Sequence, residues 1–528
     1  MRRFLGVCVA SAVVASFAFS GCGPAATSDD GYVVLASRAV ASDAEWMAVA
    51  EALAAKHSAS LHIFETAPRE ALATLRAENP RWVAVVEMPE NLNRDYVIDA
   101  HALSREIDDD IYADYLWGVV SGYDAASAMR MVVESTEPLV VKSAVATIME
   151  TNSAKWFDRY GYVDDHTPGL WGEKTAADQP VVRDSIDPRG VLRKFTDLYE
   201  AYDPDMIITA AHATQRNLEM PFSLGNLRPR DGRLYADSRI NRGRFAHDGG
   251  EEWNLAEGGN TSEGASGDTG NASACGSNTP KRKVYLAVGN CLIGDFDGSR
   301  ESMAPAWISG HNAVAMSGYV VTTWHGRNGW GGLKYLLTTP GRHTVAEAIY
   351  LNQQDMLHQF NEWAPTLIRE PFDYDGYMNA DETDFDLESE TFRRLTAAVD
   401  GEPTADQLGF WHDRDVLVYY GDPKWDVRLQ QIAAENDFVV TASRDGDLVT
   451  VTVETSAGFS PERMAGDGFK QEHVLDLPFS HFFAERLENP RLAPGQEWNA
   501  AVDENFLLVY DPGFEPGRKY TIVLQTGK

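Results

Sequence analysis

Apolar and polar residues alternate in blocks along the first quarter of the chain. Short runs rich in Val, Ile and Leu at 32–37 and 82–86 predict buried strands. Residues 43–56, which lie between these runs, place apolar side chains at helical spacing, and residues 68–78 do the same. Strands that alternate with helices predict a parallel sheet with helices on its faces. We therefore expect a first α/β subdomain over residues 32–135.

The pattern continues with the same alternation and predicts a second α/β subdomain over residues 136–430. An apolar run at 205–211 and another at 284–288 have the length of buried strands. The segment between them is irregular, and residues 249–283 are rich in Gly, Ser and Asn, which favours a mobile insertion. Further elements are expected as a helix at 188–202, a helix at 301–317, a strand at 319–323, a glycine-rich loop at 326–332, a helix at 345–360 and a strand at 416–420.

The hydrophobic period changes from helical to alternating near the C-terminus. Segments such as DLVTVTVET and KYTIVLQ alternate apolar and polar residues and are separated by Gly or Pro turns. Short alternating strands without helical segments predict a small β-sandwich, here of Ig-like type, over residues 436–528. The expected fold class is thus α/β, a two-part catalytic region with a parallel sheet, followed by this β-sandwich.

The charge narrows the choice of partners. The chain has 46 basic and 79 acidic residues and a formal net charge of −33. Such a surface repels phosphate backbones, so we expect no nucleic-acid partner. The sequence leaves the oligomeric state open.

The N-terminus has the pattern of an export signal. Two arginines precede an apolar stretch, and a small-residue site ends at Cys22. This resembles a bacterial lipoprotein signal at 1–21, with a lipid carried by Cys22 and a tether at 22–31; an ordinary secretory signal is the alternative. Either signal predicts an exported protein. Because Gly23 follows the cysteine, a lipid anchor in the outer membrane or cell envelope is favoured.

Two chemically reactive side chains follow two of the predicted strands. His212 comes directly after the run at 205–211, and Cys291 follows the run at 284–288 and Gly289-Asn290. The carboxyl ends of parallel strands are where reacting groups gather in open α/β sheets. If the strands are neighbours, His212 can accept the proton of Cys291 or stabilise its thiolate. A disulfide between Cys275 and Cys291 is the structural alternative for this cysteine.

The segment GNCLIGDFDG around Cys291 resembles the nucleophile segment of gingipain-type cysteine peptidases, which have a caspase-like fold. The upstream position of His212 matches the order of that family. The resemblance spans residues 32 to 528. Three further segments carry it: Asp110 to Gly122, Gly329-Trp330-Gly331 and Tyr420-Gly421-Asp422-Pro423.

The resemblance implies an exported cysteine endopeptidase that cleaves polypeptides through a thioester acyl-enzyme. It assigns the oxyanion hole to the backbone N–H groups of Ala213 and Cys291, and the substrate pocket to Trp330. The family pattern places Gly after the histidine, where this chain has Ala213. An alanine keeps the N–H donor, provided that the backbone conformation suits a residue with a Cβ.

Several alternatives remain open at the level of sequence. His325-Gly326 also follows an apolar run and is a rival base, although it comes after the cysteine. Glu150 or Asp205 is a candidate for the group that orients His212. A catalytically inactive relative that binds peptide or protein partners, and a thiol hydrolase or transferase acting on non-peptide acyl groups, are the alternative functions.

No cofactor is expected from the sequence. Cys291, His311 and His325 lack the paired spacing of zinc ligands. Asp295, Asp297 and Glu301 form an oxygen cluster that suits a structural calcium ion, whereas a capped helix start explains the same residues without a metal. The basic residues 281–283 are interpreted either as an activation cleavage site or as the end of a solvated loop.

Overall fold

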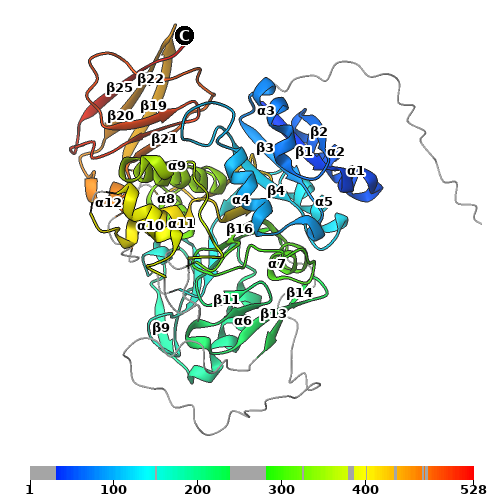
Figure 1. Cartoon of the computed structure of the whole chain (residues 1–528). Helices are drawn as coiled ribbons and strands as arrows, with labels where there is room; N and C mark the ends of the chain where they lie inside the picture. Colours follow the sequence, from blue (N-terminus) through cyan, green and yellow to red (C-terminus); the bar gives the residue numbers. More distant parts are fainter. Residues whose placement is uncertain are drawn as a thin grey trace, which may run out of the picture.

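Figure 1 shows the computed structural model of the chain. It describes residues 31–148, 151–237, 281–323, 326–377, 386–399, 401–432, 437–466, 469 and 474–527. Within these ranges, no helix has both the length and the apolar character needed to cross a membrane. The predicted signal peptide, Cys22 with all but the last residue of the tether, and most of the predicted insertion lie outside the described residues.

A twelve-stranded, mainly parallel sheet forms the centre of the molecule, in the order β2-β1-β3-β4-β17-β16-β15-β10-β6-β7-β8-β9. Most of its central strands are fully buried, as expected for strands covered by helices on both faces. The predicted α/β fold is therefore confirmed, and both predicted subdomains contribute to one continuous sheet. The strands are β1 (Tyr32–Ser37), β2 (Ser60–Phe64), β3 (Trp82–Val86), β4 (Leu116–Val120), β6 (Ser143–Ala146), β7 (Arg159–Val163), β8 (Leu170–Lys174), β9 (Val182–Ser185), β10 (Met206–Thr209), β15 (Lys283–Ala287), β16 (Ala313–Tyr319) and β17 (Leu417–Tyr420).

The direction of the strands reverses once in the middle of the sheet. β17 pairs antiparallel with β16, whereas it is parallel to β4 on its other side. The strands β2, β1, β3, β4 and β17 therefore run one way, and β16, β15, β10, β6 and β7 run the other way. As a result, the carboxyl ends of the two halves lie at opposite edges of the sheet.

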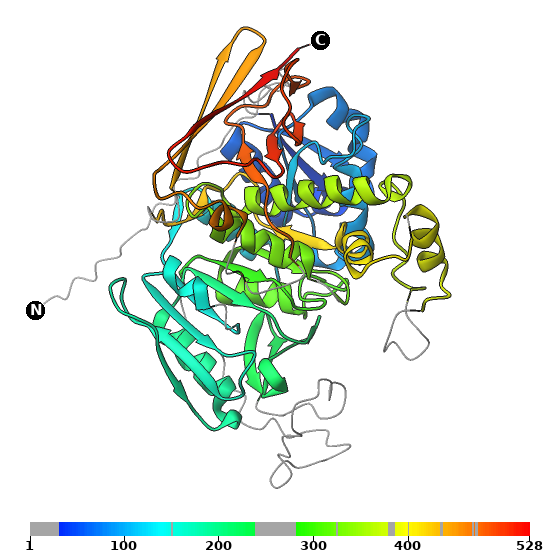
Figure 2. The same ribbon diagram turned by 90° about the vertical axis from the view of Figure 1, so that its left-hand side faces the viewer.

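Helices pack against both halves of the sheet. α2 packs on β1 and on α5, α6 packs on β6 and β7, and α8 packs on β15 and β16 and on α9. In both views α9 runs directly below the C-terminal strands (Figures 1 and 2). The α-helices are α1 (Arg38–Ser42), α2 (Ala44–His57), α3 (Leu72–Glu78), α4 (Arg94–Leu103), α5 (Ala125–Glu134), α6 (Val191–Tyr202), α7 (Met303–His311), α8 (Arg327–Thr338), α9 (Val345–Trp363), α10 (Glu390–Ala398), α11 (Ala405–Asp413) and α12 (Pro461–Ala465). Short 3₁₀ helices occupy Pro68–Ala71, Pro89–Asn91, Thr151–Trp156, Pro188–Gly190, Pro221–Ser223 and Pro365–Leu367.

Two small sheets form the predicted C-terminal β-sandwich. One has the order β19-β20-β25-β22 and the other β21-β24-β23. Their facing side chains, among them Val451, Ile522, Phe479 and Leu507, share one buried core. Tyr350 of α9 joins this sandwich to the α/β region, because its ring contacts Phe482 and Phe506 and its hydroxyl donates to the carbonyl of Ala113 (2.6 Å). The strands are β19 (Phe438–Asp445), β20 (Leu448–Thr455), β21 (Phe479–Phe482), β22 (Arg491–Leu492), β23 (Ala500–Asp503), β24 (Phe506–Val509) and β25 (Lys519–Gln525).

Two further sheets lie within the α/β region. One is an antiparallel sheet in the order β11-β12-β13-β14 that begins directly after His212, and the other pairs β5 with β18. Their strands are β5 (Leu139–Val141), β11 (Ala213–Thr214), β12 (Asn217–Glu219), β13 (Asn226–Arg230), β14 (Arg233–Asp237) and β18 (Val427–Leu429).

Three predicted elements differ from the structure. The helix expected at 301–317 ends at His311, because Asn312 adopts a left-handed conformation (φ 55°), and β16 occupies 313–319 instead of the strand expected at 319–323. The expected glycine-rich loop at 326–332 forms the first turns of α8. Its glycines allow close packing: a Cβ on Gly329 would lie 2.4 Å from the Val288 carbonyl oxygen.

Candidate active site

His212 and Cys291 follow two strands that are direct neighbours in the sheet. β10 and β15 are parallel, with Thr209 opposite Ala287, and the Val288 N–H extends the ladder by donating to the carbonyl of Thr209 (2.9 Å). The chain leaves the sheet on both strands at the same edge. The condition set by the sequence analysis, that the two strands are neighbours, is therefore met.

The side chain of Asn290 bridges the two segments beyond the strands. Its Nδ2 donates to the carbonyl oxygen of Ala211 (2.8 Å), and its Oδ1 accepts from the hydroxyl of Thr209 (2.6 Å). Asn290 is fully buried. The residue before Cys291 is thus hydrogen-bonded to the residue before His212, so the two segments are held side by side.

Cys291 is a free thiol at a half-buried position. Its Sγ donates to the carbonyl oxygen of Thr323, at an S–O distance of 3.6 Å. Burial raises the pKa of the thiol above its usual value, and the charge of Asp413 acts in the same direction. Burial therefore disfavours the thiolate form of Cys291 in this conformation. The next residue, Leu292, has a φ of 57°, which is unfavourable for a side chain of this size.

His212 is exposed and begins the β11–β12 hairpin. The N–H of Glu219 donates to the carbonyl of His212 (2.9 Å), which makes these two residues a hydrogen-bonded pair. Ala213 is the next residue and lies opposite Leu218. Hydrogen-bonded and non-hydrogen-bonded pairs alternate along antiparallel strands, so the N–H of Ala213 points away from β12. Ala213 is also in extended backbone, where a Cβ causes no strain.

Trp330 lies in α8 and is 5% exposed. Its indole packs behind the segment that leads to Cys291: a Cβ on Gly289 would lie 2.8 Å from the indole Nε1. On its other side, Phe469 of the C-terminal region contacts the ring edge to face, with centroids 6.1 Å apart. The structure thus places Trp330 close to the nucleophile segment, as a packed side chain behind it.

The structure also places the remaining candidates. His325, Glu150 and Cys275 lie outside the described residues. Asp205 precedes β10, so it lies at the opposite end of this strand from His212, and it caps the start of β6 by accepting from the N–H of Lys142 and Ser143 (both 2.9 Å). Asp205 is therefore not the group that orients His212.

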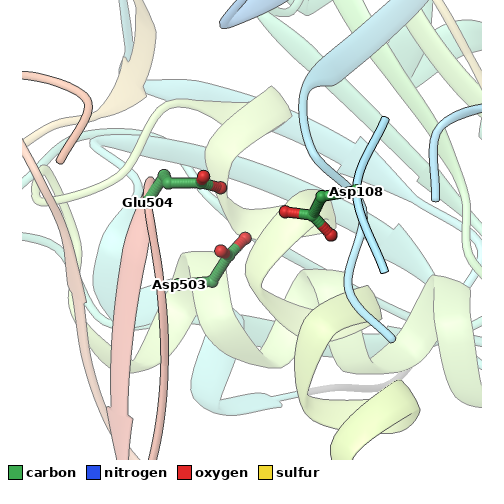
Figure 3. Close-up of side chains that lie close together, drawn as sticks. All are labelled: Asp108, Asp503 and Glu504. Atoms are coloured by element: carbon green, nitrogen blue, oxygen red, sulfur yellow. The ribbon is translucent and has the colours of Figure 1, made fainter. Parts of the chain in front are cut away.

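The three carboxylates proposed for calcium have protein partners. Asp295 accepts from the Gln215 amide (3.0 Å), Asp297 pairs with Arg216, and Glu301 accepts from the hydroxyl of Tyr123 and the N–H of Asp231. Among the described residues, carboxylates close enough to share an ion occur elsewhere. They are Asp108, Asp503 and Glu504, whose nearest oxygens lie within 4.8 Å of one another (Figure 3).

The basic residues 281–283 lie at the start of β15, at the opposite end from Cys291. Lys283 is fully buried and pairs with Asp203 (2.8 Å), and Lys281 pairs with Asp205 (2.9 Å). The Arg282 guanidinium donates to the carbonyls of Glu134, Glu137 and Pro138. Lys281 is nevertheless exposed, whereas Lys283 is buried. These contacts anchor the segment at the start of β15, so it is not simply the end of a solvated loop, and the activation cleavage site remains a hypothesis.

Sequence reasoning missed the roles of Asn290 and Thr209. Asn290 was visible only as part of the turn before Cys291, and its two partners lie at the end of β10 and just beyond it, 81 and 79 positions earlier. A polar residue directly before a candidate nucleophile at a strand end was the one signal available. The acidic group in Figure 3 was likewise hidden, because its members come from the two ends of the chain.

Comparison with known proteins gives a likeness at the level of structures alone. No protein-family model matches the sequence, and no curated protein is significantly similar to it. The crystal structure of the Arg-specific cysteine proteinase gingipain R (RgpB) aligns over 96% of this chain and 94% of its own, with 8% identity and a TM-score of 0.40. A complex of the Porphyromonas gingivalis RgpB pro- and mature domains covers 94% and 93% at 8% identity and a TM-score of 0.38. A structure described as a protease covers 94% and 95% at 10% identity and a TM-score of 0.39. Sequence identities and TM-scores this low support no conclusion about function, so the functional argument rests on the residues of the site.

Proposed function

We propose that this protein is a cysteine peptidase in which Cys291 is the nucleophile and His212 the base. The observation that carries the proposal is the hydrogen bond from Asn290 to the carbonyl of Ala211, which ties the segments before the two residues together (2.8 Å). A thiol and an imidazole at the same edge of a sheet are the groups required for nucleophilic acyl transfer. The substrate class is polypeptide.

The proposed reaction begins when His212 accepts the thiol proton of Cys291. The sulfur then attacks the carbonyl carbon of the scissile bond, and the resulting oxyanion accepts hydrogen bonds from the N–H groups of Ala213 and Cys291. His212 returns the proton to the leaving amine, which leaves a thioester on Cys291. A water molecule, deprotonated by His212, hydrolyses the thioester, releases the acid product and restores the thiol. The N–H of Ala213 points away from β12, which supports its assignment to the oxyanion hole.

The sequence adds a location to this function. The signal pattern at 1–21 supports export, and Cys22 supports a lipid anchor in the outer membrane or cell envelope. The measurement is incorporation of labelled palmitate, which Cys22→Ser should abolish and Cys275→Ser should leave unchanged. Labelling that persists in Cys22→Ser would reject the anchor without affecting the peptidase proposal.

A second candidate is an inactive relative that binds peptides at the same edge of the sheet. The observation in its favour is the state of Cys291: burial raises the pKa of the thiol, and its proton is directed at the carbonyl of Thr323. A nucleophile must be released from this contact before it can react. A protein in which the contact persists would bind peptides without cleaving them.

Labelling with a library of peptidyl acyloxymethyl ketones distinguishes the two candidates. These reagents alkylate an activated active-site thiol, so we expect labelling of the native protein and none in Cys291→Ala or His212→Ala. His166→Ala is the matched control, because this ring is also exposed (60%) and follows β7, which β6 separates from β10 in the sheet. Labelling that survives His212→Ala and is lost in His325→Ala would transfer the role of base to His325. Absence of labelling together with peptide binding would favour the inactive relative.

A further inference from the structure

We infer that Asn290 is the positioning residue of this site: its side chain sets the separation between the segments that carry Cys291 and His212. The inference rests on the proposed function for its catalytic meaning, whereas the geometry itself stands on the contacts of Asn290. Both partners of Asn290 belong to the His212 side of the site, while its backbone leads directly to Cys291. A change in this side chain therefore acts on the relative position of the two segments.

The hydrogen bonds around Asn290 have one consistent direction. The Thr209 hydroxyl donates its single hydrogen to Asn290 Oδ1 (2.6 Å), so it must accept from the Tyr285 hydroxyl, whose oxygen lies 2.9 Å away. At the other side of the amide, Nδ2 donates to the carbonyl of Ala211 (2.8 Å). Turning the amide over would place Oδ1 against that carbonyl. The series of hydrogen bonds from Tyr285 to Ala211 therefore fixes the orientation of the Asn290 amide.

The site of the amide leaves little freedom for it to move. Asn290, Thr209 and Tyr285 are all fully buried, and the ring of Tyr285 packs against Trp307 at a tilt of 34°, with ring centroids 4.3 Å apart. Leaving a buried polar group without its hydrogen-bond partner is costly. We therefore expect these hydrogen bonds to persist together in the folded state. An asparagine is needed at position 290, because the position requires one acceptor and one donor on a short side chain.

A change at Asn290 should disturb the alignment of Cys291 with His212. Displacing a catalytic group by about 1 Å lowers the rate by about 10²-fold. Asn290→Asp keeps the acceptor for Thr209 but replaces the donor to Ala211 by a second acceptor, which pushes the Ala211 carbonyl away. Thr209→Val removes the hydroxyl from the chain, and Thr209→Ser, which retains it, is the matched control.

The experiment measures two properties of the full chain. The first is peptide hydrolysis, in which Asn290→Asp and Thr209→Val should lower kcat about 10²-fold with KM nearly unchanged, while Thr209→Ser stays near the native values. The second is the pH profile of Cys291 alkylation by iodoacetamide, read by mass spectrometry of the Cys291 peptide. We expect the profiles of Asn290→Asp and Thr209→Val to match that of His212→Ala. Asp205→Asn, at the far end of β10, should lower stability and leave this profile native.

The outcomes separate the inference from the proposed function. If Asn290→Asp is folded and retains both the native kcat and the native alkylation profile, the inference is wrong. If the native chain hydrolyses no peptide but its alkylation profile depends on His212 and Asn290, the positioning role stands and the peptidase proposal fails. If the alkylation profile is independent of His212, then His212 and Cys291 do not act together. That result would overturn both the inference and the proposed function.

Discussion

The imidazole of His57 lies 2.6 Å from the carboxylate of Asp422, at Nε2 and Oδ2. This contact joins the end of α2 to the turn after β17, so it fastens the first subdomain to the strand that joins the two halves of the sheet. Lys56 pairs with the same oxygen (2.8 Å), and the Tyr32 hydroxyl donates to the other (2.9 Å). Burial alone raises the pKa of Asp422, but His57 and Lys56 outweigh it and hold the pKa well below its usual range.

Asp422→Asn should lower the free energy of unfolding by about 3 kcal/mol at neutral pH, because it leaves the half-buried Lys56 without its counter-charge. A lowered folded-state pKa contributes stability above the unfolded pKa of about 4, and this contribution is lost as the pH falls through the folded value. The variant should therefore lose less stability than the native chain on acidification below about pH 4. Urea unfolding at pH 7 and pH 3 measures both effects. Asp426→Asn, at an exposed pair with Arg428, is the control and should cost under about 1 kcal/mol.

Asp114→Asn should increase stability at alkaline pH. Burial, aided by the charge of Asp108, raises the pKa of Asp114 to about 8. The folded chain therefore holds a proton that the unfolded chain has released from about pH 4 upward, so native stability falls as the pH rises toward 8. The amide removes this loss and can still accept from the N–H of Ile107. Thermal unfolding at pH 5 and pH 9 tests it, with the exposed Asp99→Asn as control; an equal shift at both pH values would contradict the assignment.

Gly289→Ala should disturb the nucleophile without unfolding the protein. The new methyl group would lie 2.8 Å from the indole Nε1 of Trp330 and 3.1 Å from the Cβ of Ala210, so the segment before Cys291 must shift. We expect the rate of acyloxymethyl ketone labelling to fall roughly 10-fold or more, in line with the cost of misplacing a reacting group. Trp330→Phe in the same chain should restore part of the rate, because the smaller ring makes room. Gly190→Ala, where the nearest atom is an ordinary 3.5 Å away, is the matched control.

Leu292 tests whether the conformation directly after Cys291 is strained. Its φ of 57° lies in the left-handed region, which is costly for branched side chains and tolerated by asparagine. Leu292→Val should therefore lower the unfolding free energy by about 1–3 kcal/mol more than Leu292→Asn. Chemical unfolding of the two variants measures the difference. If valine is tolerated as well as asparagine, the left-handed conformation is not imposed by the fold.

Strands such as β1, β3, β10 and β15 were predictable because their runs of Val, Ile and Leu are short and end in Gly, Asn or polar residues. The sequences of β7, β8 and β9 contain few such residues, and these strands were not predicted. β16 was misplaced because its segment, Ala313–Tyr319, follows α7 without a Pro or Gly, and the single stop signal is Asn312 in a left-handed conformation. The glycines of α8 were assigned to a loop because sequence does not tell close packing from turn formation. For Gly329, only the close approach of the Val288 carbonyl shows that the glycine serves close packing.

The positions of Cys291 and His212 were predictable from strand ends, since the sheet determines which edge such residues occupy. The contacts that hold them were not, because Asn290 reaches partners set by tertiary pairing. The acidic group could not be predicted for the same reason. Asp108 and Asp503 come together only once the β-sandwich has docked on the α/β region. Local pattern thus predicts the main elements and the strand ends that carry Cys291 and His212, whereas side-chain partners depend on the assembled sheet.

The anchoring of Arg282 at the start of β15 has a consequence for the integrity of the chain. β15 is hydrogen-bonded to β10 on one side and to β16 on the other, and Arg282 is held by three carbonyls of another segment. A break in the backbone anywhere in 238–280 would leave all of these bonds intact. The two resulting pieces would migrate separately on a denaturing gel and yet elute together from a sizing column, as a stable non-covalent pair.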